Sequence, residues 1–289
     1  MNIEKSLTNK ICLVTGATSG IGAVTVEALA EKGATVIIVG RYPKKSKSTV
    51  NRIRQKTGNS SIEFMLADLS SQEEIHCLAE QFKKKYQRLD VLINNAGAYF
   101  RSRHLSVDGY EMTFALNHLG YFLLTNLLLN TLKASVPARI INVSSNAHER
   151  GRINFEDLQR QRNYHGFEVY AQSKLANILF TYELAKRLKG TGITVNALHP
   201  GGVATNLGRN NGWIRHIIKR LVKRKLISPV DGAQTSIYLA TSKDVQGVTG
   251  KYFVKSKSVP SSKTSYDEVL GHQLWKVSAE MTGLPVAKI

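Results

Sequence analysis

The sequence predicts an α/β fold: a single doubly wound parallel sheet with helices on both faces. Short runs rich in Val, Ile and Leu alternate along the chain with longer amphipathic runs of helical period. These apolar runs are nearly continuous, which is typical of parallel strands buried on both faces. The 289 residues also contain no internal repeat, low-complexity stretch or linker, so we expect one domain over residues 1–289.

Each apolar run of strand length is paired with the amphipathic run that follows it. In chain order, the predicted strands and helices are 11–15 with 20–32, 35–40 with 44–57, 62–67 with 72–86, 91–94 with 109–133, 139–143 with 169–189, and 194–198 with 213–225. A helix at 230–241, a short strand at 251–254 and a C-terminal extension at 255–289 complete the chain. Because ligands bind beyond the carboxyl ends of the strands in such sheets, the residues just after each strand are the candidates for chemistry.

The charge balance is the one unusual total. The chain has 40 Lys and Arg against 21 Asp and Glu, a formal net charge of +19. Such a balance favours phosphates, nucleic acid or an anionic membrane surface as partners. The basic clusters at 44–47, 83–85 and 215–225 are scattered rather than forming one groove, so we expect no specific nucleic-acid partner.

The cysteines and the start of the chain exclude several classes of protein. With only Cys12 and Cys77, a disulfide scaffold is excluded, and we expect both to be buried thiols in a reducing compartment. No cluster of Cys, His and acidic residues has the spacing of metal ligands, so no metal site is expected. Residues 1–10 are polar, and no apolar run reaches the ~18 residues that span a bilayer, so we expect a soluble, cytoplasmic protein.

A glycine-rich turn follows the first predicted strand and opens the first predicted helix. Its glycines allow close approach of the backbone to a pyrophosphate, and the free N–H groups of the helix point at the anion. A turn placed in this way predicts a dinucleotide site. The residues expected to contact the cofactor are Gly16, Thr18, Ser19, Gly20, Ile21 and Gly22.

The spacing of these glycines, with Thr15 in front, resembles the short-chain dehydrogenase/reductase family. The resemblance runs from about Lys10 to Val254 and rests on several motifs in the family's order. The segment between Ser145 and Tyr170 is longer than in many members and resembles the insert of the retinol dehydrogenase-like branch. The resemblance implies a Rossmann fold and an oxidoreductase that acts on alcohol or carbonyl groups.

The end of the second predicted strand indicates which nicotinamide nucleotide binds. An NAD site usually carries an acid there, whereas this chain has Arg41, with Lys44 and Lys45 close behind. A guanidinium pairs with a 2′-phosphate in fork geometry, so we predict NADP(H); the alternative is that Arg41 is a solvated strand-end residue. From the residues alone, Asp68 equally fits the start of the next helix. Further cofactor contacts implied by the resemblance are Asp68, Leu69, Asn95, Ala96, Gly97, Pro200, Gly201, Val203 and Thr205.

Tyr170 and Lys174 lie four residues apart on one face of a predicted helix, so their phenol and ammonium groups meet. A nearby cation favours the phenolate, and we expect it to lower the pKa of Tyr170 from about 10 toward neutrality. In the family both side chains contact the cofactor, and the residue pattern selects Ser145 over Ser144 as the hydroxyl that bonds the substrate oxygen. In the family an Asn at the position of Asn117 orders a water that relays protons to this pair.

Residues 212–226 predict a basic amphipathic helix, with an apolar stripe and Lys and Arg on the remaining positions. In the family this region is the lid over the substrate pocket. The helix either packs its apolar stripe on its own domain or lies on an anionic membrane. An apolar lid favours an apolar substrate, and the resemblance implies retinal, a long aldehyde or another lipophilic carbonyl compound.

The expected reaction moves a hydride between the nicotinamide and a carbonyl or alcohol, while Ser145 orients the oxygen and Tyr170 exchanges its proton with it. Two alternatives stay open. A light-dependent protochlorophyllide reductase shares the tyrosine and lysine, and a non-catalytic basic Rossmann module would use the same fold for binding. The family often pairs long helices between subunits, which implies a homo-oligomer. Peripheral contact with an anionic membrane is also expected.

Overall fold

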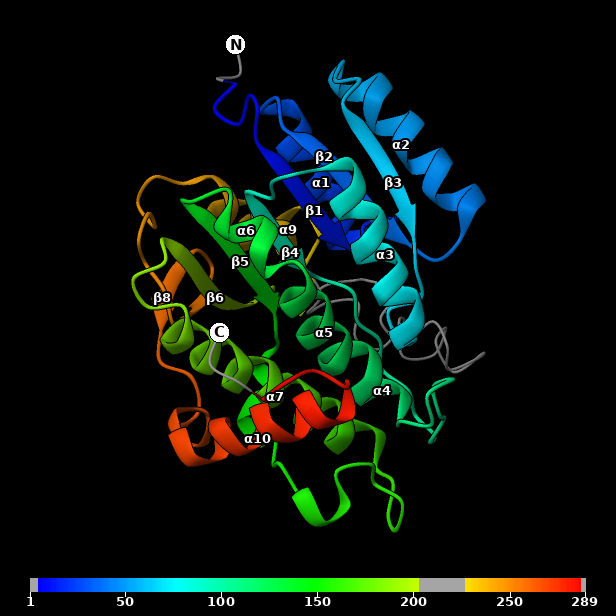
Figure 1. Cartoon of the computed structure of the whole chain (residues 1–289), viewed down its shortest axis with the longest axis vertical. Helices are drawn as coiled ribbons and strands as arrows, with labels where there is room; N and C mark the ends of the chain where they lie inside the picture. Colours follow the sequence, from blue (N-terminus) through cyan, green and yellow to red (C-terminus); the bar gives the residue numbers. More distant parts are fainter. Residues whose placement is uncertain (1–4, 203–226, 287–289) are drawn as a thin grey trace.

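The computed structural model describes residues 5–202 and 227–286, which form one eight-stranded sheet between two layers of helices (Figure 1). The strands are β1 (Ile11–Thr15), β2 (Thr35–Gly40), β3 (Ile62–Leu66), β4 (Val91–Asn94), β5 (Ala138–Val143), β6 (Ile193–His199), β7 (Lys251–Val254) and β8 (Lys257–Val259). Their order is β3-β2-β1-β4-β5-β6-β7-β8, and every pairing is parallel except that of β7 with β8. The strand order reverses between β1 and β4, which confirms the predicted doubly wound fold.

The helices cover both faces of the sheet, as predicted. They are α1 (Gly20–Glu31), α2 (Pro43–Thr57), α3 (Gln72–Lys85), α4 (Met112–Phe114), α5 (Gly120–Leu127), α6 (Leu129–Lys133), α7 (Gly166–Arg187), α9 (Pro229–Thr241) and α10 (Glu268–Met281). Side chains of α1, α2 and α9 pack on one face, and those of α3, α5, α6, α7 and α10 pack on the other. The predicted helix at 213–225 lies outside the described residues.

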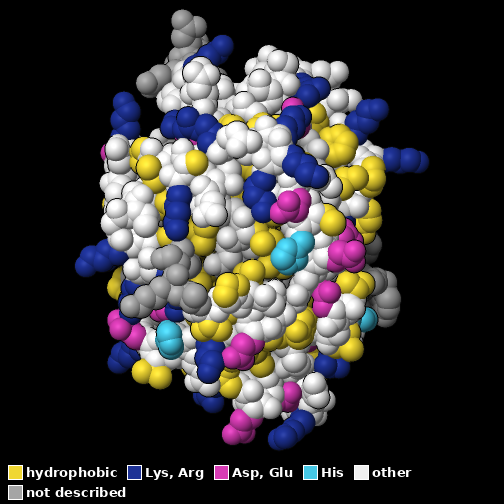
Figure 2. All heavy atoms as spheres, in the orientation of Figure 1, with side chains coloured by type: hydrophobic (Ala, Val, Ile, Leu, Met, Phe, Trp, Pro, Cys, Tyr) yellow, Lys and Arg dark blue, Asp and Glu magenta, His cyan; other side chains and the backbone are white. Residues whose placement is uncertain are grey.

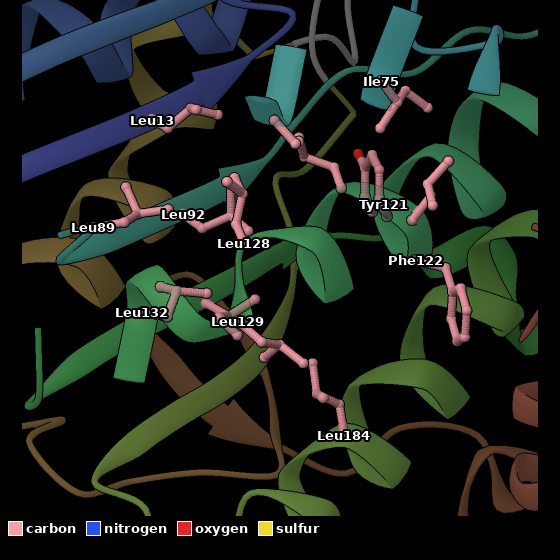
Figure 3. Packing of buried hydrophobic residues seen from close by; sticks show 14 of the residues in the cluster. Leu13, Ile75, Leu89, Leu92, Tyr121, Phe122, Leu128, Leu129, Leu132 and Leu184 are labelled. Carbon is pink, nitrogen blue, oxygen red and sulfur yellow. The ribbon is translucent and has the colours of Figure 1, made fainter. Parts of the chain in front are cut away.

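Alternation along the strands divides the core into two clusters. In β1, Leu13 points into the cluster beneath α3 and α5, whereas Cys12 and Val14 point into the cluster beneath α1 and α2. Figure 3 shows the first cluster, in which Leu13 and Leu92 of neighbouring strands face side chains of the helices. Because both faces of the strands are buried, the sheet is a rigid platform, and its carboxyl edge is available for a site.

The prediction of one continuous helix over 109–133 is wrong, because the segment is divided into several shorter elements. Gly109 adopts a left-handed φ of 81°, and the helix starts only at Met112. The buried Glu111 carboxylate accepts the first free N–H groups and so fixes this start. A π-helical turn at Ala115–Leu119 follows, and a break at Leu128 separates α5 from α6. Periodicity shows the apolar face of a helix but not an extra residue in one turn.

The C-terminal extension contains two elements that were not predicted, β8 and α10. A tight turn at Lys255 and Ser256, with φ of 49° and 60°, folds β8 back along β7. Such turns usually carry Asn-Gly or Asp-Gly, so this turn left no signal in the sequence. The helix α10 begins after a capping residue, because the Asp267 side chain accepts the Leu270 N–H at 3.0 Å.

Two further expectations concern cysteines and membrane spans. Cys12 is buried, as expected, but Cys77 is exposed on α3, so the expectation of two buried thiols is wrong for Cys77. Within the described ranges, none of the helices has the length and apolar character needed to span a membrane. In the same ranges, no three His, Cys, Asp or Glu side chains gather as a metal site would require.

Candidate active site

The glycine-rich turn after β1 packs directly against the end of β4. A Cβ on Gly16 would lie 2.7 Å from the Ala96 Cα, and one on Gly22 would lie 2.6 Å from the Asn95 Nδ2. Gly16 also has a φ of 64°, in the left-handed region that favours glycine. The Asn95 Nδ2 donates to the Thr15 carbonyl at 2.8 Å and holds the two strand ends together. The residues of the predicted dinucleotide loop therefore form one closely packed surface.

The start of α1 is open to an anion. Ser19 is its N-cap residue but makes no hydrogen bond from its side chain to the first turn, which contains no acidic residue. The Lys45 Nζ reaches across from α2 and donates to the Ser19 Oγ at 3.3 Å. Free N–H groups, the positive end of a helix and a lysine together form a donor set that suits a phosphate.

Arg41 and Asp68 are partners at the ends of β2 and β3. The Arg41 Nη1 lies 3.4 Å from the Asp68 Oδ2, and both side chains are partly exposed. The other carboxylate oxygen of Asp68 accepts the Ser70 N–H at 3.0 Å and its hydroxyl at 2.7 Å. Burial would raise the pKa of Asp68, but these hydrogen bonds and the Arg41 charge outweigh it and hold the pKa below its usual value. Ser71, not Asp68, caps α3, so the alternative helix-start role of Asp68 is wrong.

Asn117, Lys174 and Gly97 meet at the carboxyl end of β4. Lys174 is buried, and its Nζ donates to the Val143 carbonyl at 3.0 Å. The Asn117 Oδ1 accepts the Ala98 N–H at 2.9 Å from within the π-helical turn. A Cβ on Gly97 would lie 3.2 Å from the Asn117 Oδ1 and 3.5 Å from the Lys174 Nζ. The structure therefore brings these three predicted site residues together, and π-helical turns are frequent at functional sites.

The two serines after β5 have different surroundings. The Ser144 hydroxyl donates to the Lys174 carbonyl at 2.7 Å, which anchors α7 to the sheet. The Ser145 hydroxyl instead accepts the Ala147 N–H at 3.2 Å and donates to the Asn146 Oδ1 at 3.3 Å. It also lies close enough to the Tyr170 phenol to lower the pKa of that group. Of the two hydroxyls, that of Ser145 is the one beside the phenol.

The pKa values of the tyrosine and lysine differ from the sequence-based expectation. Burial raises the pKa of Tyr170 to about 12, and the neighbouring Ser145 hydroxyl offsets this only in part. Burial also lowers the pKa of Lys174 to about 7. The Lys174 Nζ lies 5.6 Å from the centroid of the Tyr170 ring. The expected lowering of the Tyr170 pKa is not found, because a cation that burial itself disfavours gives little stabilisation to a phenolate.

The remaining predicted cofactor residues follow β6. Pro200 and Gly201 directly follow the strand, and Gly201 has a φ of 91° beside the Ile227 side chain. Val203 and Thr205 lie outside the described residues. The site also includes Tyr99. Its ring is T-shaped to the Tyr170 ring, with the two centroids 6.1 Å apart. No spacing rule marks such a residue in the sequence, because it comes from the loop after β4.

A groove of about 840 Å³ lies at the opposite edge of the sheet. It is lined by residues at or just before the starts of strands, Lys10, Val91, Ala138 and Ile193 among them, and by the ends of α7 and α9. It contains none of the predicted site residues. The catalytic candidates therefore gather at the carboxyl edge, where open α/β sheets bind their ligands.

Comparisons with known proteins agree on one family. A family model described as short chain dehydrogenase matches residues 10–212. Retinol dehydrogenase 14 of Mus musculus is 43% identical, over 95% of this chain and 86% of its own length. A crystal structure of an uncharacterized protein from Mycobacterium paratuberculosis has a TM-score of 0.80 at 32% identity and covers 99% of this chain and 100% of its own. Pseudomonas aeruginosa RhlG, solved as an active-site complex with NADP, has a TM-score of 0.70 at 28% identity and covers 88% and 97%.

The family model spans β1 to β6 and thus every element that carries the glycine turn, Ser145, Tyr170 and Lys174. The curated relative extends the similarity into the C-terminal elements. The chain belongs to the short-chain dehydrogenase family, as an oxidoreductase acting on alcohol or carbonyl groups, and within that family it is similar to the retinol dehydrogenases.

Proposed function

We propose that this chain is an NADP(H)-dependent oxidoreductase that interconverts a lipophilic carbonyl compound and its alcohol. The observation that carries the proposal is the meeting of Ser145, Tyr170 and Lys174 beside the glycine turn. A hydroxyl donor, a partly buried phenol and a lysine in one cluster are what proton transfer to a carbonyl oxygen requires. A scaffold that only binds would have no use for this arrangement.

The residues around the glycine turn fit a nicotinamide dinucleotide. The turn leaves no room for a Cβ at Gly16 or Gly22, and the start of α1 offers donors without a competing acid. Arg41 and Lys45 border this surface and supply positive charge for a 2′-phosphate, which supports NADP(H) over NAD(H). RhlG, a related structure, was solved with NADP, which supports the same choice.

The residues of the cluster divide the chemistry between them. When bound, the nicotinamide ring supplies or accepts the hydride. The Ser145 hydroxyl donates a hydrogen bond to the substrate oxygen and orients it. Tyr170 holds its proton at neutral pH, because its pKa is about 12, and donates it to the oxygen as negative charge develops there. Lys174, whose Nζ lies 5.6 Å from the centroid of the Tyr170 ring, would contact the bound cofactor. Alcohol oxidation would use the same residues in reverse.

The surroundings of Tyr170 support a lipophilic substrate. The Tyr99 ring lies against Tyr170, and Phe167, one turn earlier on α7, is 47% exposed. Aromatic side chains offer apolar area to a ligand that has few polar groups. The similarity to retinol dehydrogenases points in the same direction, so a retinal-like aldehyde is the first candidate.

The direct test is oxidation of NADPH with a panel of aldehydes and ketones that includes retinal. We expect turnover with long apolar aldehydes, and Tyr170→Phe should bind NADPH as the wild type does while losing most turnover. The matched control is Tyr110→Phe, since the Tyr110 hydroxyl donates to the Met281 carbonyl away from the cluster. Turnover of Tyr170→Phe within a few-fold of wild type would contradict the assigned role.

Three further proposals concern the whole chain. We propose that residues 1–289 fold as one domain, that the chain self-associates through its long helices as family members often do, and that it contacts anionic membranes from the cytoplasmic side. Light scattering gives the mass of the purified chain in solution and so tests self-association. The third is supported by the net charge of +19 and by the basic stripe at 213–225, which lies outside the described residues.

A further inference from the structure

His148 connects the candidate active site to the C-terminal part of the chain. It lies three residues after Ser145, in a 3-10 turn at Asn146–Arg150, and its side chain is buried. The spacing of the sequence motifs did not single it out. Its partner, Ser262, belongs to the segment beyond β8, outside the residues that the family model matches.

Both imidazole nitrogens of His148 are hydrogen-bonded to backbone. The Nδ1 lies 2.6 Å from the Ser145 carbonyl oxygen, and the Nε2 accepts the Ser262 N–H at 3.0 Å. A carbonyl oxygen only accepts and a backbone N–H only donates, so the contacts fix one state of the ring. His148 is a neutral imidazole with its proton on Nδ1.

The turn links the carbonyl of Ser145 to its hydroxyl. The Ser145 carbonyl also accepts the His148 backbone N–H at 3.2 Å, while the Ser145 Oγ accepts the Ala147 N–H at 3.2 Å. Both groups of Ser145 are therefore held by the same turn. A shift of the carbonyl moves the hydroxyl relative to the Tyr170 phenol, whose pKa that hydroxyl lowers.

The donor at Ser262 is itself held rigidly. The Ser262 carbonyl accepts the Ser265 N–H at 3.0 Å, and the preceding Ser261 hydroxyl lies 2.7 Å from that of Tyr182 on α7. The Tyr252 ring of β7 is T-shaped to the His148 ring, with the two centroids 4.9 Å apart. Since α7 also carries Tyr170, both ends of the connection are fixed to the helix that holds the phenol.

We propose that His148 is a positioning residue, through which the segment 261–265 holds the Ser145 turn and sets the Ser145 hydroxyl for proton transfer. The inference rests on the proposed function. It makes the C-terminal extension a working part of the active site, because Ser262 supplies the outer hydrogen bond. A small displacement of a group that orients the substrate lowers kcat and leaves cofactor affinity unchanged.

A backbone substitution separates this role from ordinary packing. Ser262 has a φ of −60°, which proline also adopts, so Ser262→Pro removes the N–H donor with little change of backbone. Ser262→Ala is the matched control, because it removes the same hydroxyl but keeps the N–H. We expect kcat of Ser262→Pro to be roughly ten- to a hundredfold below that of Ser262→Ala, with equal KM for NADPH. Equal kcat values for the two variants, both folded by thermal denaturation, would overturn the inference.

A second pair of variants covers the case in which proline prevents folding. His148→Asn keeps an N–H near the Nδ1 position and so restores the hydrogen bond to Ser145, whereas His148→Leu has the bulk without the donor. We expect His148→Asn to recover a substantial part of the kcat that His148→Leu loses, at similar thermal stability. Equal kcat losses in the two variants would mean that His148 only fills space.

The tautomer can be measured without turnover, which separates this inference from the proposed function. The ¹⁵N resonances of the His148 ring in the wild type should show a proton on Nδ1, and Ser262→Pro should shift the Nε2 resonance. A proton on Nε2 would overturn the inference even if NADPH oxidation is observed. Absence of any carbonyl turnover would instead count against the proposed function, while the ring resonances still report on the connection.

Discussion

At the scale of single residues, Arg41 is the side chain that we propose to decide between the two nicotinamide nucleotides. Arg41→Asp places a carboxylate where we propose that the 2′-phosphate binds, so repulsion replaces an ionic hydrogen bond. We expect kcat/KM for NADPH to fall roughly ten- to a hundredfold and that for NADH to fall less or to rise. Steady-state kinetics with both nucleotides measure this, and Lys133→Asp, an equal charge change at an exposed lysine of α6, is the control. A wild type that uses NADH as well as NADPH would contradict the cofactor proposal.

Lys174 makes the stability of the protein depend on pH. Its pKa in the folded chain is about 7, well below that of an exposed lysine. Between those two values the unfolded chain binds the extra proton, so the free energy of unfolding rises with pH, and the full penalty remains below the folded-state pKa. Lys174→Met removes this titration. We therefore expect the variant to gain stability at pH 7 and this gain to shrink toward pH 9, by at most roughly 1.4 kcal/mol per pH unit.

Urea denaturation of both proteins at pH 7, 8 and 9 gives the difference directly. Because Lys133 is exposed, Lys133→Met should show a difference from wild type that does not change with pH. A flat difference for Lys174→Met as well would mean that the lysine titrates as an ordinary surface group. The measurement tests burial alone and needs neither cofactor nor substrate.

At this scale, the sequence predicts a contact when both residues lie close together in the chain. Tyr170 and Lys174 share a helix face, so their spacing alone predicts that they meet. The pKa values could not be predicted, because they depend on burial by segments far away in the sequence. The role of His148 could not be predicted for the same reason, since its partner Ser262 lies 114 positions away in the sequence.

At the scale of elements, Gly120 limits how α5 approaches the loop between β3 and α3. It is the first residue of α5, just after the π-helical turn, and a Cβ there would lie 2.5 Å from the Leu69 carbonyl oxygen. Because backbone does not yield easily, Gly120→Ala should lower the free energy of unfolding by roughly 1–3 kcal/mol. Gly271→Ala is the matched control within α10, where the nearest atom would lie 3.8 Å away.

Chemical denaturation gives the change in the free energy of unfolding for both variants. Gly271→Ala should be neutral or stabilising by up to about 1 kcal/mol, because alanine favours helix over glycine. Gly120→Ala should also reduce turnover, since α5 follows the turn that holds Asn117. Stabilisation by Gly120→Ala would show that α5 does not pack closely on Leu69.

The elements predicted from the sequence are those in which the hydrophobic pattern of one strand or helix continues without interruption. Seven strands were found near their observed bounds because apolar runs bounded by turns define them. The interrupted helix after β4 was not found, because the π-helical turn at Ala115–Leu119 keeps the apolar face and changes only the hydrogen bonds. The C-terminal α10 is not predicted, although it has an Asp cap and buried positions at Gly271, Leu274 and Ser278, which follow the helical period.

At the scale of the whole molecule, the positive charge is spread widely over the surface. Figure 2 shows Lys and Arg side chains spread across the visible face rather than gathered in one patch. The described cluster at Lys44 and Lys47 on α2 is one contributor among several. One 2′-phosphate accounts for little of a net charge of +19, so the remaining charge acts as a diffuse field.

A diffuse positive field predicts salt-sensitive attraction to anionic lipid. Each Lys or Arg near such a surface contributes about 1 kcal/mol, and the contribution falls off within a Debye length, roughly 8 Å at physiological salt. In co-sedimentation we expect binding to vesicles rich in phosphatidylserine at low salt, loss of binding near 0.5 M salt, and no binding to neutral vesicles. Lys44→Glu with Lys47→Glu should weaken this binding without abolishing it, because many separate charges contribute. Full loss in that variant would place the interaction on α2 alone, and binding to neutral vesicles would mean that apolar contact, not charge, drives it.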